Sequence, residues 1–394
     1  MRVLQASWPT PSHFFSQVPV AWALRSAGHE VRIISAPGIE GAVLRSGLPL
    51  STVGSELNPG AAWKGFSLRP EEGTDEREHE RERSARAFSM FATGAVEMLD
   101  DVARFCEAWE PDLVLYEPRM YAALKAARTL GVPAVRVLPG PDYTFTRRED
   151  ERAQVEELFG RIGLAGEDPF GDLTLDPCPP SLQVDDGGAV NRLRMRFVPY
   201  NGSAVVPDWL SARPARPRVF ISLGTMVATL LGNMNFVQDA IRAIAELDVE
   251  VLAGVFSDQR ELLGELPGNV RLVEDMPLHL MLPTCDAVVH HGGAGTLLTT
   301  ASYGVPQLLL SSVGDTVLTA RQITAAGAGV SVRAWDATPE RIRTLVSDLL
   351  GQPSYKQAAV RLAGENARQA DPADIVARLE DLAHQARRSP VGVG

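Results

Sequence analysis

A repeated strand–helix–strand pattern constrains the fold of this chain more than any other feature. Residues 2–7 (RVLQAS) predict a short strand, apolar residues at helical spacing predict a helix over 14–27, and 30–35 (EVRIIS) predict a second strand. The same order of elements returns within 112–138 and again after residue 218. Since consecutive parallel strands need a crossover helix, the pattern predicts an α/β protein with mostly parallel sheets.

The chain is long enough for two such units. Its 394 residues exceed the roughly 100–200 residues of a typical domain. Prolines at 199, 207, 214 and 217 mark a segment with little periodicity. We therefore expect an N-terminal domain over 1–198, an interdomain linker over 199–217 and a C-terminal domain over 218–372. We expect residues 373–394 to form a helix that packs back on the N-terminal domain, followed by a tail.

The net charge excludes one class of partner. The 38 basic and 49 acidic side chains give a net charge of −11, which argues against nonspecific binding to nucleic acid or to an anionic membrane surface. An anionic ligand would therefore need a local device such as a helix N-terminus. The densest charged run, 71–86 (EEGTDEREHERERSAR), pairs acids and bases three or four residues apart, which predicts an exposed helix or a mobile loop.

The sequence shows no targeting or redox signal. Its N-terminus lacks the apolar core of a signal peptide, and no apolar run reaches the roughly 20 residues of a membrane-spanning helix. The three cysteines lie far apart, and no C-x-x-C pair is present. We therefore expect a cytoplasmic protein without disulfides, a cysteine-based zinc site or a membrane span.

The strongest chemical signal is the segment 288–296 (VVHHGGAGT). A buried strand runs into a glycine-rich turn and then a helix, an arrangement whose free N–H groups and helix dipole attract a diphosphate. His291 can donate a further hydrogen bond. The alternative is a tight turn that needs glycine only for its backbone angles.

Better-known ligand motifs are absent from the sequence. Leu298 stands where the dinucleotide motif G-x-G-x-x-G needs its last glycine, and the chain has no G-K dipeptide of a Walker A loop. It also has no D-x-D pair and no H-E-x-x-H motif. The sequence therefore predicts neither a cofactor nor a metal site.

Two further signals lie at the ends of predicted strands, where open α/β sheets bind their ligands. The segment 222–225 (SLGT) ends the first strand of the second half. His13 follows the first strand of the other half, in a segment that its prolines predict to be a loop. This imidazole could act as a general base, with Glu117 or, alternatively, Asp142 fixing its tautomer. A lone histidine in a loop is otherwise structural or solvent-exposed.

These positions together resemble the family 1 glycosyltransferases of the GT-B fold, in particular bacterial enzymes that decorate polyketide and other antibiotic aglycones. The resemblance extends over nearly the whole chain. Its most specific parts are SHFFSQVPVAWALRSAGHEV (12–31), DPCPPSL (176–182), SLGT, MPLHLMLPTCDAVVHHGGAGT (276–296) and GDTVLTAR (314–321). It implies two Rossmann-like domains that face each other across a cleft, the N-terminal one for an acceptor and the C-terminal one for a nucleotide sugar.

The resemblance implies a role for each candidate residue. His13 falls at the family's catalytic base, and Glu117 falls where many relatives have an aspartate that orients it. Asp315 matches the acid of an Asp-Gln pair that binds sugar hydroxyls, and Thr316 replaces the glutamine, which suits a deoxysugar. The other positions match contacts of the donor nucleotide diphosphate: Ser222, Thr225, Met276, Leu278, His291, Gly293, Gly295 and Thr296.

The implied reaction is a metal-independent displacement with inversion, in which His13 deprotonates an acceptor hydroxyl while the diphosphate leaves. The donor would be a dTDP- or UDP-(deoxy)sugar, and the acceptor a hydrophobic natural-product aglycone in antibiotic biosynthesis. Eight residues of the N-terminal half are candidates for the acceptor wall or for plain core: Trp8, Phe14, Phe15, Trp63, Phe66, Met90, Tyr143 and Phe145.

Three other classes of protein compete with this interpretation. One is a catalytically silent partner of a glycosyltransferase, although such a partner has no need of His13. Another is a nonhydrolysing nucleotide-sugar epimerase, which needs carboxylates as acid and base. The third is a nicotinamide dehydrogenase, against which the missing G-x-G-x-x-G motif counts. The sequence leaves open which sugar and acceptor are used, whether the protein is a homodimer, and whether an activator protein is required.

Overall fold

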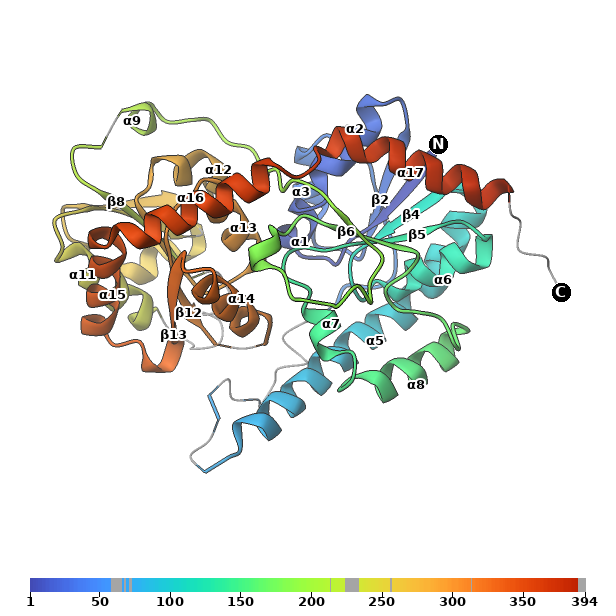
Figure 1. Ribbon diagram of the computed structural model, residues 1–394, viewed down its shortest axis with the longest axis horizontal. Helices are drawn as coiled ribbons and strands as arrows, with labels where there is room; N and C mark the ends of the chain where they lie inside the picture. Colours follow the sequence, from blue (N-terminus) through green and yellow to red (C-terminus); the bar gives the residue numbers. More distant parts are fainter. Residues whose placement is uncertain are drawn as a thin grey trace. The chain divides into compact units, whose positions relative to one another are not determined.

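The computed structural model describes residues 1–57, 66, 69–70, 73–212, 214–223, 234–255, 257–312 and 314–388. These residues fold into two compact units, each built around one sheet (Figure 1). The first unit comprises Met1–Cys178, Val184–Arg196 and the chain from Gln369 onward, and the second comprises Pro179–Gln183 and Phe197–Arg368.

The segment 199–217, predicted to be a linker, belongs to the second unit. Within it, α9 (Asp208–Ser211) turns the side chain of Leu210 into a core cluster that also holds Phe220 and Leu252. This segment therefore packs on the second unit through Leu210, whereas its Val205 and Val206 are exposed.

The first sheet has the strand order β3-β2-β1-β4-β5-β6-β7, and neighbouring strands run parallel. Its strands are β1 (Arg2–Ala6), β2 (Glu30–Ser35), β3 (Leu50–Thr52), β4 (Leu113–Tyr116), β5 (Ala134–Val137), β6 (Leu173–Asp176) and β7 (Arg192–Arg194). Its helices are α1 (Pro11–Phe15), α2 (Val18–Ser26), α3 (Glu40–Arg45), α5 (Glu76–Trp109), α6 (Tyr121–Leu130), α7 (Tyr143–Arg147), α8 (Arg152–Ile162) and α17 (Pro372–Arg388).

The second sheet has the strand order β10-β9-β8-β11-β12-β13 and is also parallel. Its strands are β8 (Arg218–Ser222), β9 (Glu250–Val255), β10 (Val270–Glu274), β11 (Ala287–His290), β12 (Gln307–Ser311) and β13 (Gly329–Arg333). Besides α9, its α-helices are α11 (Asn235–Ala245), α12 (Leu278–Met281), α13 (Ala294–Ser302), α14 (Gly314–Ala325), α15 (Pro339–Gly351) and α16 (Pro353–Ala367). Short 3-10 turns cover Pro180–Leu182, Ser257–Leu263, Leu282–Thr284 and Ala334–Asp336.

The predicted helix over 14–27 is in fact two helices, α1 and α2. The segment around His13, predicted to be a loop, is helical from Pro11. Proline is tolerated at this first helical position, because its missing N–H would have no intrahelical partner there. The loop prediction was wrong because it treated proline as a helix breaker at every position.

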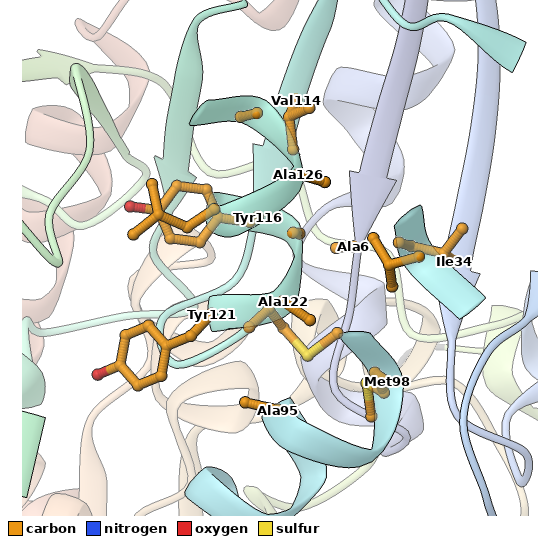
Figure 2. Close-up of a cluster of buried hydrophobic side chains, with 14 of the residues drawn as sticks. Ala6, Ile34, Ala95, Met98, Val114, Tyr116, Tyr121, Ala122 and Ala126 are labelled. Carbon is orange, nitrogen blue, oxygen red and sulfur yellow. The ribbon is translucent and has the colours of Figure 1, made fainter. Parts of the chain in front are cut away.

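The charged run before residue 86 opens the long helix α5 rather than a loop. Farther along α5 the buried residues recur at intervals of three, four or seven: Phe88, Ala95, Met98, Val102, Cys106 and Trp109. Figure 2 shows Ala95 and Met98 of α5 beside Tyr121 and Ala122 of α6. This apolar stripe stabilises the helix as a whole.

The C-terminal helix α17 is part of the first unit and lies along α2 (Figure 1). Its buried face consists of Ile375, Val376, Leu379 and Ala383. Two ion pairs flank this face, one from His29 to Glu380 and one from Arg387 to Asp112.

Candidate active site

Each sheet reverses its strand order at one place, between β1 and β4 in the first unit and between β8 and β11 in the second. The loops after two such strands diverge, and α/β proteins bind ligands in the crevice that this leaves. Four of the predicted site residues follow or end these strands. They are His13, Glu117, Ser222 and His291.

In the first unit, His13 and Glu117 form a contact between His13 Nδ1 and Glu117 Oε1. The Glu117 side chain is only 5% exposed, and its Oε2 accepts from the Trp8 N–H at 2.8 Å. The His13 side chain is 36% exposed. A carboxylate at Nδ1 favours the tautomer with its proton on that nitrogen, so the lone pair lies on Nε2. The arrangement is that of an oriented general base.

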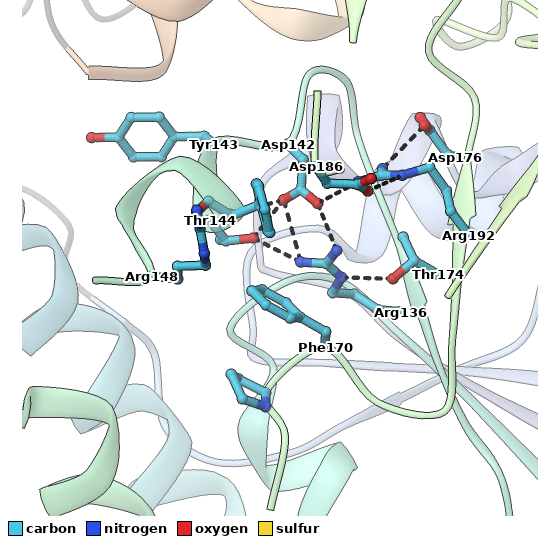
Figure 3. A network of polar contacts seen from close by, with 12 residues as sticks. Arg136, Asp142, Tyr143, Thr144, Arg148, Phe170, Thr174, Asp176, Asp186 and Arg192 are labelled. Atoms are coloured by element: carbon cyan, nitrogen blue, oxygen red, sulfur yellow. Dashed lines mark hydrogen bonds and ion pairs between the residues drawn. The ribbon is translucent and has the colours of Figure 1, made fainter. Parts of the chain in front are cut away.

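Asp142, the alternative partner of His13, is engaged elsewhere (Figure 3). Its Oδ2 accepts from Arg136 Nη2 at 2.6 Å and from Arg192 Nη2 at 3.3 Å. Its Oδ1 accepts from the Phe145 N–H at 3.1 Å and so caps α7. Asp142 is therefore part of a buried ion-pair network, and the alternative in which it pairs with His13 was wrong.

Three of the eight candidate acceptor-wall residues belong to the core. Trp8, Phe14 and Phe145 are buried, and Trp63 lies outside the described residues. A cavity of about 340 Å³ in the first unit has none of the eight in its lining. Its apolar lining comes from Pro118, Tyr121, Val155, Phe159, Pro169 and Phe170.

In the second unit, His290 holds the glycine-rich turn by a hydrogen bond to its backbone. It is fully buried, with Nε2 2.8 Å from Gln307 Oε1, and its Nδ1 accepts from the Gly292 N–H at 3.2 Å. Burial lowers the pKa of His290 to about 3, with the neighbouring His291 acting in the same direction. His290 is thus a neutral imidazole that donates to Gln307 and accepts from the turn.

The two glycines of the turn have close neighbours. Gly292 has a φ of +99°, and a Cβ there would lie 3.1 Å from Thr316 Cβ. A Cβ on Gly293 would lie 2.7 Å from His291 Nε2. The turn therefore needs glycine at position 292, which adopts a left-handed conformation, whereas a side chain at position 293 would displace the His291 ring.

The helix that follows presents unpaired N–H groups. Its first intrahelical hydrogen bond runs from Leu297 N–H to Gly293 O at 3.0 Å. The N–H groups of Gly295 and Thr296 have no acceptor among the residues that the structure describes. With the helix dipole, these donors form an anion-binding end.

His291 lies beside this helix end. Burial lowers its pKa, while the negative charge of Asp315 acts in the opposite direction. Its Nδ1 is buried and has no hydrogen-bond partner within the described part of the chain. His291 is therefore a neutral donor in the absence of ligand.

Helix α14 also hydrogen-bonds the backbone of the glycine-rich turn. Thr319 Oγ1 donates to Gly292 O at 2.6 Å. Thr316 is buried and its Oγ1 accepts from the Ser312 N–H at 3.3 Å, whereas Asp315 is exposed in the first helical turn. Thr316 lies against Gly292, and its expected contact with a donor sugar stays a prediction.

The remaining donor-site candidates are distributed along the same edge. Ser222 ends β8 directly beside His290 in the sheet register. Met276 and Leu278 follow β10 and pack in part against the core cluster around Phe220. Thr225 lies outside the described residues.

Sequence reasoning missed the residues that support the site. Gln307 and Thr319 hold the glycine-rich turn, and Arg119 lies two residues after Glu117 with a positive φ. None of them belongs to a recognisable motif. Only Arg119 could have been noticed in the sequence, because it follows Pro118 at the turn position where glycine is the common residue.

The described residues contain neither a metal-binding group nor a membrane-spanning helix. No three His, Cys, Asp or Glu side chains there gather as a metal-binding group. No helix among these residues is both long and apolar enough to cross a membrane.

Comparisons with known proteins cover the whole chain. Models of the erythromycin biosynthesis protein CIII-like family match it, the N-terminal domain over residues 22–224 and the C-terminal domain over 238–382. The chain is 37% identical to the 10-deoxymethynolide desosaminyltransferase of Streptomyces venezuelae, with 99% of each protein aligned. It is also 37% identical to the TDP-daunosamine transferase DnrS of Streptomyces peucetius, over 100% of this chain and 99% of that one.

Solved structures agree with these relatives. The spinosyn rhamnosyltransferase SpnG superposes with a TM-score of 0.84 at 32% identity, covering 96% of this chain and all of SpnG. The glycosyltransferase VinC, solved with dTDP, superposes with a TM-score of 0.83 at 33% identity, covering 98% of this chain and 100% of VinC. SpnG has also been solved with thymidine diphosphate and with the spinosyn aglycone.

Proposed function

The chain belongs to the erythromycin biosynthesis protein CIII-like glycosyltransferases of the GT-B fold, and we propose that it transfers a deoxysugar from a dTDP-sugar to a hydrophobic polyketide-type aglycone with inversion. The resemblance in sequence and the enzyme class are thereby confirmed. The stereochemistry of the transfer and the identities of the base, the donor and the acceptor are what we propose.

The observation that carries the proposal is the His13–Glu117 contact at the switch point of the first sheet. In the proposed step, His13 Nε2 takes the proton of the acceptor hydroxyl as its oxygen forms a bond to the anomeric carbon. The bond from that carbon to the diphosphate oxygen breaks, and dTDP leaves with the electron pair. Glu117 stabilises the imidazolium that results.

The second unit supplies the donor side of the same step. The unpaired N–H groups at the start of α13 and the neutral His291 can hydrogen-bond the diphosphate. In the proposal these groups stabilise the negative charge that develops on the diphosphate as the bond to the anomeric carbon breaks. In the proposal they replace a divalent metal ion, and Asp315 binds hydroxyls of the donor sugar.

The choice of substrates follows the relatives. One relative is named for desosamine and 10-deoxymethynolide, another for TDP-daunosamine, and VinC and SpnG were solved with thymidine diphosphate. Thymidine diphosphate sugars are therefore the proposed donors, in preference to uridine diphosphate sugars.

The proposal is tested by binding and then by turnover. We expect dTDP to raise the Tm more than UDP at equal concentration, and NAD to have no effect. Incubation with dTDP-desosamine and 10-deoxymethynolide, or with other macrolide and anthracyclinone aglycones, should give a product of summed mass minus dTDP. A protein that binds no nucleotide would contradict the proposal and favour a silent partner, and conversion of a nucleotide sugar without any aglycone would favour an epimerase.

A further inference from the structure

The turn after β4 contains a strained residue beside the proposed base. Glu117 opens this turn, and the Met120 N–H donates back to Glu117 O at 3.0 Å. Pro118 and Arg119 lie between them, and Arg119 has a φ of +74°. The third position of a type II turn, where φ is positive, favours glycine because a Cβ is crowded there. An arginine at this place holds the backbone under strain.

The side chain of Arg119 is anchored away from the turn. Its Nη2 donates to both carboxylate oxygens of Glu151, at 2.9 and 2.7 Å, and both side chains are 6% exposed. Ser84 Oγ of α5 donates to the same carboxylate at 2.9 Å. The guanidinium also lies 5.1 Å from the Phe91 ring and 5.5 Å from the Phe88 ring. Arg119 thus ties the turn to α5 and to the start of α8.

A second chain of contacts runs from α5 to the carboxylate of Glu117 itself. The Phe91 ring lies 4.6 Å from the Trp8 ring, and the Trp8 N–H donates to Glu117 Oε2 at 2.8 Å. Phe91 therefore contacts both the guanidinium of Arg119 and the residue that holds Glu117. The position of Glu117 is set by its turn and by this packing together.

We propose that Arg119 is a positioning residue for the His13–Glu117 pair, holding the strained turn so that the Glu117 carboxylate stays against His13. This role rests on the proposed function of His13 as general base. Arg119 acts through Glu117 and touches neither His13 nor a reacting atom. Glycine would fit the turn without strain, so what the arginine adds is its buried ion pair with Glu151.

The first test needs no substrate. In full-length protein with nitrogen-15 histidine, the ring signals of His13 can be identified among the seven histidines as those lost in His13→Ala. Arg119→Met combined with Glu151→Leu removes both charges of the pair, so no buried charge is left unpaired. We expect this variant to shift the His13 signals toward those of Glu117→Gln. Arg128→Met, a control that removes an arginine with two acidic partners in the same unit, should leave them in place.

The second test is kinetic and uses an aglycone that the wild type accepts. We expect the double variant to lower kcat by roughly 10- to 100-fold, the size of effect that a displaced catalytic group produces, with the dTDP affinity unchanged. Arg119→Lys, which keeps the charge but is shorter and lacks the planar guanidinium that lies near the Phe88 and Phe91 rings, should lie in between. In a His13→Ala background the double variant should have almost no further effect, because it acts through the base.

Unchanged His13 signals in the double variant would overturn the positioning role, as would kcat losses that multiply in the His13→Ala background. The failure of the proposed function has a different signature. If His13→Ala alone left kcat unchanged, the base assignment would be wrong, while the nitrogen-15 signals would still report whether Arg119 holds the pair together.

Discussion

At the scale of single residues, the adjacent histidines 290 and 291 do different work because their surroundings differ. His290 has both ring nitrogens hydrogen-bonded within the second unit, and burial lowers its pKa to about 3. His291 has a buried nitrogen without a partner among the described residues and lies at the helix end that the diphosphate is proposed to occupy. The first is a structural support and the second is the proposed ligand contact.

The lowered pKa of His290 predicts a loss of stability in acid. The unfolded chain protonates this histidine near pH 6.5, while the folded chain keeps it neutral down to about pH 3, so the unfolded state binds more protons between these values. From pH 7 to pH 5, His290 should therefore lower the free energy of unfolding by roughly 2 kcal/mol. Urea unfolding at the two pH values measures this, and His290→Asn should lose less stability than wild type over that interval. An equal loss in both proteins would show that His290 is not kept neutral.

The proposed role of His291 predicts an effect on donor binding. Replacing it with alanine removes one hydrogen bond to an anion, which is worth about 1.5–3 kcal/mol, so the Kd for dTDP should rise roughly tenfold or more. Calorimetric titration checks this. His384→Ala, at an exposed position of α17, is the matched control and should leave the Kd as it is. A Kd for His291→Ala equal to that of the control would remove His291 from the diphosphate site.

Single residues also show which contacts of the site the sequence could predict and which it could not. His13 and Glu117 could be paired in advance, because both follow strands of one parallel sheet and such ends meet at one edge. Asp142 follows β5 of the same sheet and looked equally suitable. Only the structure shows that Arg136 and Arg192, which come from β5 and β7, occupy its carboxylate. Contacts between residues so far apart leave no local pattern.

At the scale of elements, the sequence was sufficient to predict a helix or strand where the element's own residues have a clear pattern. The strands at 2–7 and 30–35 were found within one residue, because both are short strands whose β-branched and apolar residues are paired with a neighbouring strand on each side. The segment around His13 was misjudged because it is rich in proline, and Pro11 in fact begins a helix. The proline-rich segment 199–217 is part of the second unit.

Helix α17 gives a prediction about stability at this scale. Leu379 is fully buried on its inner face, so Leu379→Ala should destabilise the first unit by about 2–5 kcal/mol. Arg378→Ala, whose side chain is 68% exposed on the same helix, should change stability by less than about 0.5 kcal/mol. Urea unfolding followed by circular dichroism compares the two. Similar, small effects would mean that α17 contributes little to the first unit.

At the scale of the whole molecule, both units have the same topology, and the proposal assigns them different parts of one reaction. Each has a parallel sheet whose order reverses beside its first strand, and each has its candidate residues at that reversal. The family assignment and the glycosyltransferase activity follow from the entire chain, since relatives align over nearly all of it. Which sugar and which aglycone are used depends on side chains that no such comparison fixes.

The proposed chemistry predicts activity without a divalent metal ion. The charge of the leaving diphosphate is met by the N–H groups at the start of α13 and by His291, so excess EDTA should leave the transfer rate unchanged. Product formation in the presence and absence of the chelator measures this. A complete loss that Mg²⁺ or Mn²⁺ restores would show that a metal ion neutralises the diphosphate.

The central claim is that His13 is the general base and belongs to the acceptor half of the reaction. Its most direct test is kcat of His13→Ala measured beside the Kd of the same variant for dTDP. Removing a positioned base should lower kcat by roughly 10²–10⁴-fold while the Kd stays at the wild-type value, and Glu117→Gln should lower kcat by a smaller factor. A kcat for His13→Ala within about threefold of wild type, far less than the loss of a base produces, would contradict the claim.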